Sequence, residues 1–247
     1  MRKDASRGFE VRDFLHNKRP EGLRLIQELP LEVRLPGLLT RRTLRTPGDD
    51  EALAVGVLLG QGLVRTPADL KSLALDPSGG SVTCQITADP PACRVPRALP
   101  SSPALDAWIV ASMAADLRER QGLHPITRST HAVAVFAADG TMLSLGEDVG
   151  RHNAMDKAMG RAFLEGSLPR AAAVVLTCRI NAEAVRKAAL AGLCAMASIS
   201  RPTVQAVLLG RRLGMGLALV APEPQVLVFS GGQRFTPATP SATFPTS

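Results

Sequence analysis

The sequence predicts an α/β fold in which a mixed sheet with parallel strands is flanked by helices and preceded by a smaller N-terminal α+β portion. From residue 131 onward, short apolar runs alternate with segments of helical periodicity, a pattern typical of a sheet with parallel strands. Residues 76–102 are rich in Pro, Gly and Ser and separate the two parts. Hydrophobic residues make up 45% and aromatic residues only 3%, so Ala, Val and Leu must build the core.

These patterns divide the chain into four stretches. Residues 1–20 are polar and are expected to be flexible. Residues 21–101 form the N-terminal α+β portion, which ends in the Pro/Gly-rich loop, and residues 102–235 form the α/β part. The low-complexity tail, 236–247, is expected to be disordered.

In the N-terminal portion, residues 23–35 partly alternate and indicate two short strands that are separated at Pro30. Acidic residues followed by an apolar run and two glycines predict a helix over about 50–63. The stretch "TPADLKSLAL" predicts a second helix, with Thr66 as its cap and Pro67 as its first residue. A short strand is expected at 82–86.

The α/β part begins with a helix that has Ser102 as its cap and Pro103 as its first residue. A strand, a tight turn at Asp139-Gly140 and a second strand follow. Strands and helices then alternate to the end of the sheet. The remaining elements are expected at 131–137 (strand), 141–145 (strand), 153–166 (helix), 171–177 (strand), 181–193 (helix), 194–200 (strand), 202–214 (helix), 217–221 (strand) and 226–229 (strand).

Composition narrows the range of partners. Lys and Arg number 29 against 22 Asp and Glu, a net charge of +7 that favours an anionic partner. Exposed aromatic residues, which stack on bases, are scarce, so nucleic acid is the weaker interpretation. The sequence contains neither an apolar run of membrane-spanning length nor the apolar core of a signal peptide, and its four cysteines form no CxxC pair. A cytoplasmic protein without a tightly bound metal of its own is expected.

The stretch "GEDVGRHNAMDK", residues 146–157, concentrates polar groups where a strand gives way to a helix. Loops beyond the carboxyl ends of strands form the ligand crevice of an open α/β sheet. A helix N-terminus there offers free N–H groups and a partial positive charge. The stretch is therefore a candidate anion or nucleotide site, with four candidate binding residues: Gly150, Arg151, His152 and Asn153.

Structural explanations compete with this one. Asn153 could cap the helix, and the Asp156 side chain could bond back to the backbone of Asn153 as in a capping box. Arg151 and His152 could instead form a salt-bridge cluster with the acidic residues 147 and 148. His131, which opens a strand, could be structural or could contact a ligand.

The next two joints between strand and helix are similar. Thr177 and Arg179 stand at one, and Ser200 and Arg201 at the other. In a parallel sheet, Arg151, Arg179 and Arg201 would meet at one rim. The guanidinium group binds phosphate with a planar pair of donors, so a ligand with several phosphates would suit this rim.

The stretch "EDVGRHNAMDK" resembles the hallmark of the FdhD family, accessory proteins of formate dehydrogenase. "EALAVGVLLGQGLV" and "VVLTCRINAEAVRKA" resemble further segments of that family, so the resemblance extends over about residues 20 to 235. It implies a cytidine-deaminase-like fold, without the zinc chemistry, and a homodimer. It also implies that sulfur passes from a cysteine desulfurase to the molybdenum cofactor before this enters formate dehydrogenase, and that the cofactor's molybdopterin guanine dinucleotide form is bound.

The sequence departs from the family at the cysteine loop, where a CxxC pair would carry the persulfide. The interval here reads "VTCQITADPPACRVPRALPSS", and Cys93 is the candidate carrier because Arg94 could favour its thiolate. Cys93 could equally be an ordinary residue of a proline-rich turn. The loop at 222–225 also lacks the basic residues that the family has there.

Three interpretations remain. The protein is a sulfurtransferase that uses Cys93, or a non-catalytic carrier that binds a pterin or guanine nucleotide, or a hydrolase on a deaminase-like fold. The last is the weakest, because the HxE and PCxxC motifs of zinc deaminases are missing from the sequence.

Overall fold

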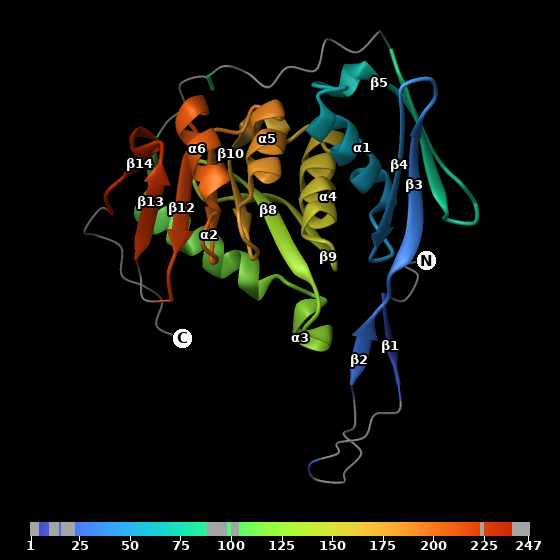
Figure 1. Ribbon diagram of the computed structural model, residues 1–247, viewed down its shortest axis with the longest axis horizontal. Coiled ribbons are helices and arrows are strands. Elements are labelled where there is room, and N and C mark those ends of the chain that lie inside the picture. The colour runs from blue at the N-terminus through green and yellow to red at the C-terminus, as the bar shows by residue number, and fades with distance from the viewer. Residues whose placement is uncertain are drawn as a thin grey trace.

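A computed structural model describes residues 5–9, 15, 23–87, 98–99, 104–222 and 225–238 of the 247-residue chain. In this part, a six-stranded mixed sheet forms the centre of the molecule, as the alternating pattern predicted (Figure 1). β10, β11 and β12 run parallel, and β8, β9 and β13 are added in antiparallel pairings. From one edge to the other, the strands are β13 (Val226–Ser230), β12 (Gly216–Val220), β11 (Ala195–Ser198), β10 (Ala171–Leu176), β8 (His131–Ala137) and β9 (Met142–Asp148).

Helices cover both faces of this sheet. One face packs against α2 (Ala107–Glu119), through a cluster that includes Val110, Phe136 and Val175. The other face packs against three helices that each follow a strand, namely α4 (Arg151–Leu164), α5 (Ala182–Leu190) and α6 (Val204–Leu213). The short helix α3 (His124–Thr127) lies at the lower end of the sheet in Figure 1.

The N-terminal portion adds a second sheet beside α4, with α1 between them (Figure 1). Its order is β4 (Leu39–Arg45), β3 (Leu29–Leu35), β6 (Ser81–Ile86) and β5 (Leu70–Leu75), and the helix is α1 (Asp50–Gln61). The smaller pieces are β1 (Ser6–Gly8) with β2 (Arg24–Ile26), β7 (Leu105–Asp106) with β14 (Phe235–Thr236), and the 3-10 turns Pro67–Asp69, Leu168–Arg170 and Gly232–Arg234.

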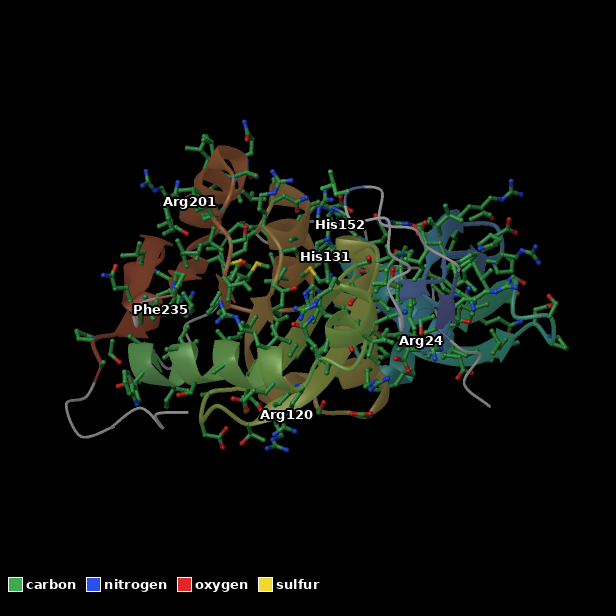
Figure 2. The ribbon with its side chains drawn as sticks, turned by 90° about the horizontal axis from the view of Figure 1, so that it is seen from below. Arg24, Arg120, His131, His152, Arg201 and Phe235 are labelled. Atoms are coloured by element: carbon green, nitrogen blue, oxygen red, sulfur yellow. The ribbon has the colours of Figure 1, made fainter. Side chains whose placement is uncertain are left out.

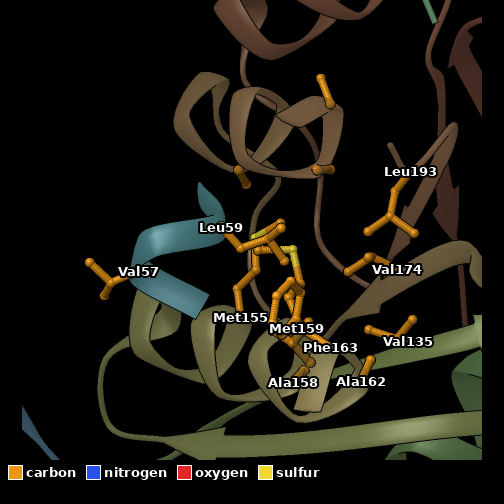
Figure 3. Close-up of a cluster of buried hydrophobic side chains, with 14 of the residues drawn as sticks. Val57, Leu59, Val135, Met155, Ala158, Met159, Ala162, Phe163, Val174 and Leu193 are labelled. Carbon is orange, nitrogen blue, oxygen red and sulfur yellow. The ribbon is translucent and has the colours of Figure 1, made fainter. Parts of the chain in front are cut away.

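The hydrophobic core between the sheets joins α1 to α4. Leu59, Met155 and Met159 meet in the close-up of Figure 3, beside Val135 and Val174 of the central sheet. Alanine, valine and leucine make up most of this core, as the composition suggested, and methionine fills gaps between them.

Two glycines allow the backbones of α1 and α4 to touch. A Cβ atom at Gly56 would stand 1.9 Å from the carbonyl oxygen of Asp156, and one at Gly160 would stand 1.9 Å from that of Ala52. No side chain fits at these distances. Glycine is therefore required at both positions for the helices to approach as closely as they do.

Two predictions for the N-terminal portion were wrong in part. The predicted helix over 66–75 is a single 3-10 turn, in which Thr66 occupies the expected cap position and forms a capping box with Asp69, after which β5 pairs with β6. Sheet pairing outweighed the local helical signal. Pro30 lies inside β3 rather than between two strands, and it is tolerated because β6 pairs with β3 only from Glu32 onward.

Two other predicted boundaries differ from the structure. The first helix of the α/β part begins at Ala107, where the carboxylate of Asp106 accepts a hydrogen bond from the N–H of Trp108 at 2.7 Å. The proposed cap Ser102 and the following Pro103 lie outside the described residues. Within the range 1–20 that was expected to be flexible, Ser6–Gly8 pairs with β2.

Candidate functional site

The polar loops that lead from strand to helix meet at one end of the central sheet, where the strands β9, β10 and β11 end. The register pairs His131 with Asp148, and β10 and β11 end side by side at Leu176 and Ser198. β8 therefore begins where β9, β10 and β11 end. Seen from this side in Figure 2, His131 and His152 lie near the middle of the rim, and Arg201 lies towards α6.

Asp148 is the centre of the joint between β9 and α4. It is fully buried. One carboxylate oxygen accepts hydrogen bonds from the Gly150 N–H at 2.8 Å and from Asn153 Nδ2 at 3.2 Å. The other accepts from the Thr46 N–H at 3.0 Å and lies 2.7 Å from Lys157 Nζ. All its lone pairs are thus used within the protein, so Asp148 holds the joint together.

Lys157 and Asn153 extend this network to the N-terminal sheet. Lys157 Nζ also donates to the carbonyl of Thr46 at 2.8 Å, and Asn153 Nδ2 donates to the carbonyl of Leu44 at 2.7 Å. The hydroxyl of Thr43 donates to Asn153 Oδ1 at 3.1 Å. Both side chains are buried. They fasten β4 and the segment after it to α4.

The capping interpretation of Asn153 and Asp156 is wrong. α4 begins at Arg151, Gly150 occupies the cap position, and no side chain caps the helix. Asp156 is fully buried and forms an ion pair with Lys187 of α5, both carboxylate oxygens lying 2.7 Å from Nζ. Burial raises the pKa of Asp156, and Lys187 opposes that shift.

The predicted salt-bridge cluster of Arg151 and His152 with the acidic residues 147 and 148 does not form. The Glu147 carboxylate accepts hydrogen bonds from the N–H groups of Gly122, Leu123 and His124, so it fastens the start of α3. His152 instead lies 3.4 Å from Glu183, and burial lowers its pKa. Arg151 is exposed, and no ion pair or hydrogen bond engages its guanidinium in the described part of the chain.

The loops after β10 and β11 contain side-chain hydrogen bonds to the backbone, and each also carries an exposed arginine. The N–H of Ala132 donates to the Thr177 hydroxyl at 2.9 Å. Ser198 donates to the carbonyl of Cys178 at 2.7 Å, and the N–H of Ser200 donates to Ser198 Oγ at 2.9 Å. Arg179 and Arg201 are exposed.

A cavity of about 690 Å³ opens at this rim, below β8 and β10. Side chains from the end of α2, from α3 and from the rim line it: Arg118, Gln121, His124, Pro125, Arg128, Ser129, Thr130, His131, Thr177 and Ile199. Of the residues predicted from the sequence, Thr177 lines the cavity. Arg151 is not among the lining residues, but its positive charge lowers the pKa of His131, which is one of them.

The cavity is cationic and lined by hydrogen-bonding groups. Arg118 and Arg128 are exposed, and no ion pair engages either of them within the described residues. Burial, together with the charges of Arg151 and His124, lowers the pKa of His131 and so favours its neutral form. Such a lining favours an anion that also offers hydrogen-bonding groups.

Arg128 has an unusual backbone conformation. Its φ of 53° is left-handed, where residues other than glycine are strained. It ends α3 and holds its side chain at the cavity. A left-handed residue commonly ends a helix, so this conformation is explained by the end of α3 and also places Arg128 at the cavity.

Sequence reasoning missed most of the cavity lining, because attention fell on the joints after strands. The available signal was the stretch "RERQGLHPITRSTH", which brings three arginines and two histidines together just before a strand. Neither periodicity nor a motif indicated that α3 folds back over the sheet edge.

The described cysteines are poor carriers in this conformation. Cys84, Cys178 and Cys194 are buried, and burial raises the pKa of Cys84 and of Cys178 to about 11. Cys93 lies outside the described residues. Among the residues that the structure does describe, no group of three His, Cys, Asp or Glu side chains is placed to hold a metal ion, and no helix has the length and apolar character needed to cross a membrane.

Fold and site together define an α/β protein with a cationic cavity at the carboxyl ends of its strands. The chain belongs to the FdhD/NarQ family, whose sequence model matches residues 91–236. It is 32% identical to the sulfur carrier protein FdhD of Streptomyces coelicolor, over 91% of this chain and 92% of that one. The corresponding protein of Mycolicibacterium paratuberculosis is 33% identical, over 87% and 92%.

A solved structure has the same fold. The crystal structure of a protein described as a formate dehydrogenase accessory protein, from Desulfotalea psychrophila, superimposes with a TM-score of 0.81. The match covers 94% of this chain and 100% of that one, at 23% sequence identity.

Proposed function

We propose that this protein is an accessory protein of formate dehydrogenase that binds the molybdopterin guanine dinucleotide form of the molybdenum cofactor and supplies sulfur to it. The observation that carries the proposal is the cationic cavity at the carboxyl edge of β10 and β11. The names of the relatives, sulfur carrier protein and formate dehydrogenase accessory protein, agree with this role.

The cargo would be held by groups that have no partner in the described part of the chain. Arg118 and Arg128 would pair with phosphate oxygens inside the cavity. Arg151 and Arg179, exposed at neighbouring joints, would extend the positive rim. Thr177 would line the floor. The cofactor here is the substrate of the protein, and its dithiolene sulfurs and phosphates match a site rich in cations.

The sulfur step requires a reactive thiol, and we assign it to Cys93. The Cys93 thiolate would attack the outer sulfur of a cysteine desulfurase persulfide, the S–S bond there would break, and the desulfurase cysteine would leave as a thiolate. Cys93 then carries the persulfide without any external oxidant. The burial of the three described cysteines supports this assignment.

The finer features of the family belong to the same proposal. We infer a cytidine-deaminase-like arrangement from the sheet order and from a cavity at its carboxyl edge. A homodimer is the expected assembly. Light scattering tests it, and a mass that stays near 26.1 kDa at all concentrations would contradict it.

Calorimetric titration with GDP tests the binding site. Wild type should bind GDP, and Arg151→Ala should lose one charge-assisted contact, worth about 1.5–3 kcal/mol. Arg211→Ala, which removes an exposed arginine from the last turn of α6, is the matched control and should bind as wild type does. Equal affinity of wild type and Arg151→Ala would remove Arg151 from the site.

A non-catalytic carrier is the second candidate, favoured by the missing CxxC pair and the buried cysteines. Incubation with a desulfurase and cysteine, followed by peptide mass spectrometry, separates the two. Sulfur transfer predicts an addition of about 32 Da on Cys93 that is lost in Cys93→Ser. An unmodified protein that still binds GDP would establish the carrier.

A further inference from the structure

Two buried polar atoms at the cavity have no hydrogen-bond partner within the part of the chain that the structure describes. They are Nε2 of Gln121 and Oγ1 of Thr130. Thr130 is only 5% exposed, and both residues line the cavity. A buried polar atom without a partner is destabilising, and folded proteins rarely hold one without a reason. Both atoms belong to the same stretch of ten residues, so they share one wall.

His124 adds an acceptor to this wall. Its Nδ1 lies 3.0 Å from the backbone carbonyl of Thr130. Because a carbonyl oxygen can only accept, Nδ1 carries a hydrogen, and Nε2 offers a free lone pair whenever the ring is in its neutral form. In the described residues, no hydrogen bond engages this Nε2.

We infer that Gln121, His124 and Thr130 recognise the amide-and-amine edge of a 2-amino-4-oxopyrimidine ring. That edge presents one carbonyl acceptor and two neighbouring donors, a ring N–H and an amino group. The Gln121 amide can donate to the carbonyl, His124 Nε2 can accept from a donor, and the Thr130 hydroxyl can do either. Guanine and pterin both have this edge, and the inference rests on the proposed function, whose cargo contains both.

The recognition requires a small movement. The two orphan atoms are shielded from water although their residues line the cavity, so the side chains must turn towards the ligand. Threonine has more than one favourable staggered position about its Cα–Cβ bond. Turning breaks no hydrogen bond of this hydroxyl with the described residues, because it makes none. A ring without matching atoms would leave these groups unpaired and would bind more weakly.

Calorimetry with three nucleotides tests the inference. Wild type should bind GDP about tenfold or more tightly than ADP, with IDP, which lacks the 2-amino group, in between. Thr130→Val removes the hydroxyl at nearly constant volume. It should lower the affinity for GDP about tenfold and change the affinity for ADP little. Thr130→Ser should restore binding. Thr40→Val, at an exposed position of β4, is the matched control and should change nothing.

A competition experiment with a pterin shows which part of the cargo, pterin or guanine, carries the recognised edge. If these residues recognise the pterin half of the cargo, neopterin should compete with GDP, and Thr130→Val should bind neopterin more weakly than wild type does. If it reads guanine, neopterin should not compete and only GDP should be affected. Either result supports recognition of this edge.

Other results would overturn the inference. Equal affinity for GDP and ADP in wild type, or equal loss of both in Thr130→Val, would remove base recognition and leave the phosphate site of the proposed function intact. Failure of wild type to bind GDP or pyrophosphate would overturn the proposed function itself. Should Thr130→Val not fold, Gln121→Met offers the same comparison on a partly exposed residue.

Discussion

The joint between β9 and α4 and the wall formed by α3 are both crowded with polar groups, yet they use them in opposite ways. Asp148, Lys157 and Asn153 are buried and bonded to one another and to the segment 44–46. Gln121 and Thr130 each hold a buried polar atom too, but that atom has no partner among the described residues. The first region is complete without a ligand, and the second is not.

The contrast shows that a dense polar motif does not by itself locate a binding site. Burial turns polar groups into structural ties when each finds a partner, because an unpaired one is costly. The polar stretch 147–157 therefore serves largely to fasten the N-terminal sheet to the central one. Binding capacity is better judged from the bonds that are missing than from the number of polar residues.

Breaking the Asp148 network should give the largest effect. Asp148→Ala leaves Lys157 buried without its partner, and should lower the free energy of unfolding by about 3–5 kcal/mol. Urea denaturation measures this. Glu119→Ala, at an exposed position of α2, should stay within about 0.5 kcal/mol of wild type. A similar small change for Asp148→Ala would contradict the view of this joint as a structural tie.

Substituting Arg128 by glycine should raise the stability of the protein and lower its affinity for GDP. Arg128→Gly relieves the left-handed strain, about 1–2 kcal/mol, and loses about 0.4–1 kcal/mol through the freer unfolded chain, so stability should rise, by up to about 1.6 kcal/mol. Affinity for GDP should fall, because a cavity cation is gone. Arg128→Ala should lose the same affinity without the gain, since its strain remains. Unchanged GDP binding in both variants would exclude Arg128 from the site.

The smallest effect concerns pH. Burial, and then the charges of Arg151 and His124, lower the pKa of His131, with Asp148 opposing them. The folded protein thus binds this proton less readily than the unfolded chain does. The corresponding stability is fully present above pH 6.5, and it is lost as pH falls from there through the lower pKa of the folded protein. His131→Gln should therefore lose less stability between about pH 8 and about pH 5 than wild type loses. Urea titrations at both pH values test this, and equal losses would contradict it.

Much of the architecture was predictable from sequence because its signals are local. Strand and helix alternation predicted the central sheet, and α1 was predicted almost to its ends. Long-range pairing was not predictable: β5 owes its extended form to β6, and Asp156 owes its burial to Lys187 of another helix. The cavity was missed for the same reason, since nothing local indicates that α3 returns to the sheet edge.

The glycine contact between α1 and α4 limits how this chain can vary or be recombined. Gly56 and Gly160 bring backbone against backbone, so even a methyl group at either position must push the helices apart. The N-terminal sheet is mounted on α4 through this crossing and through Lys157. It cannot be exchanged for another α+β unit as an independent module, because a graft would have to reproduce a glycine-bearing helix and its angle of approach together.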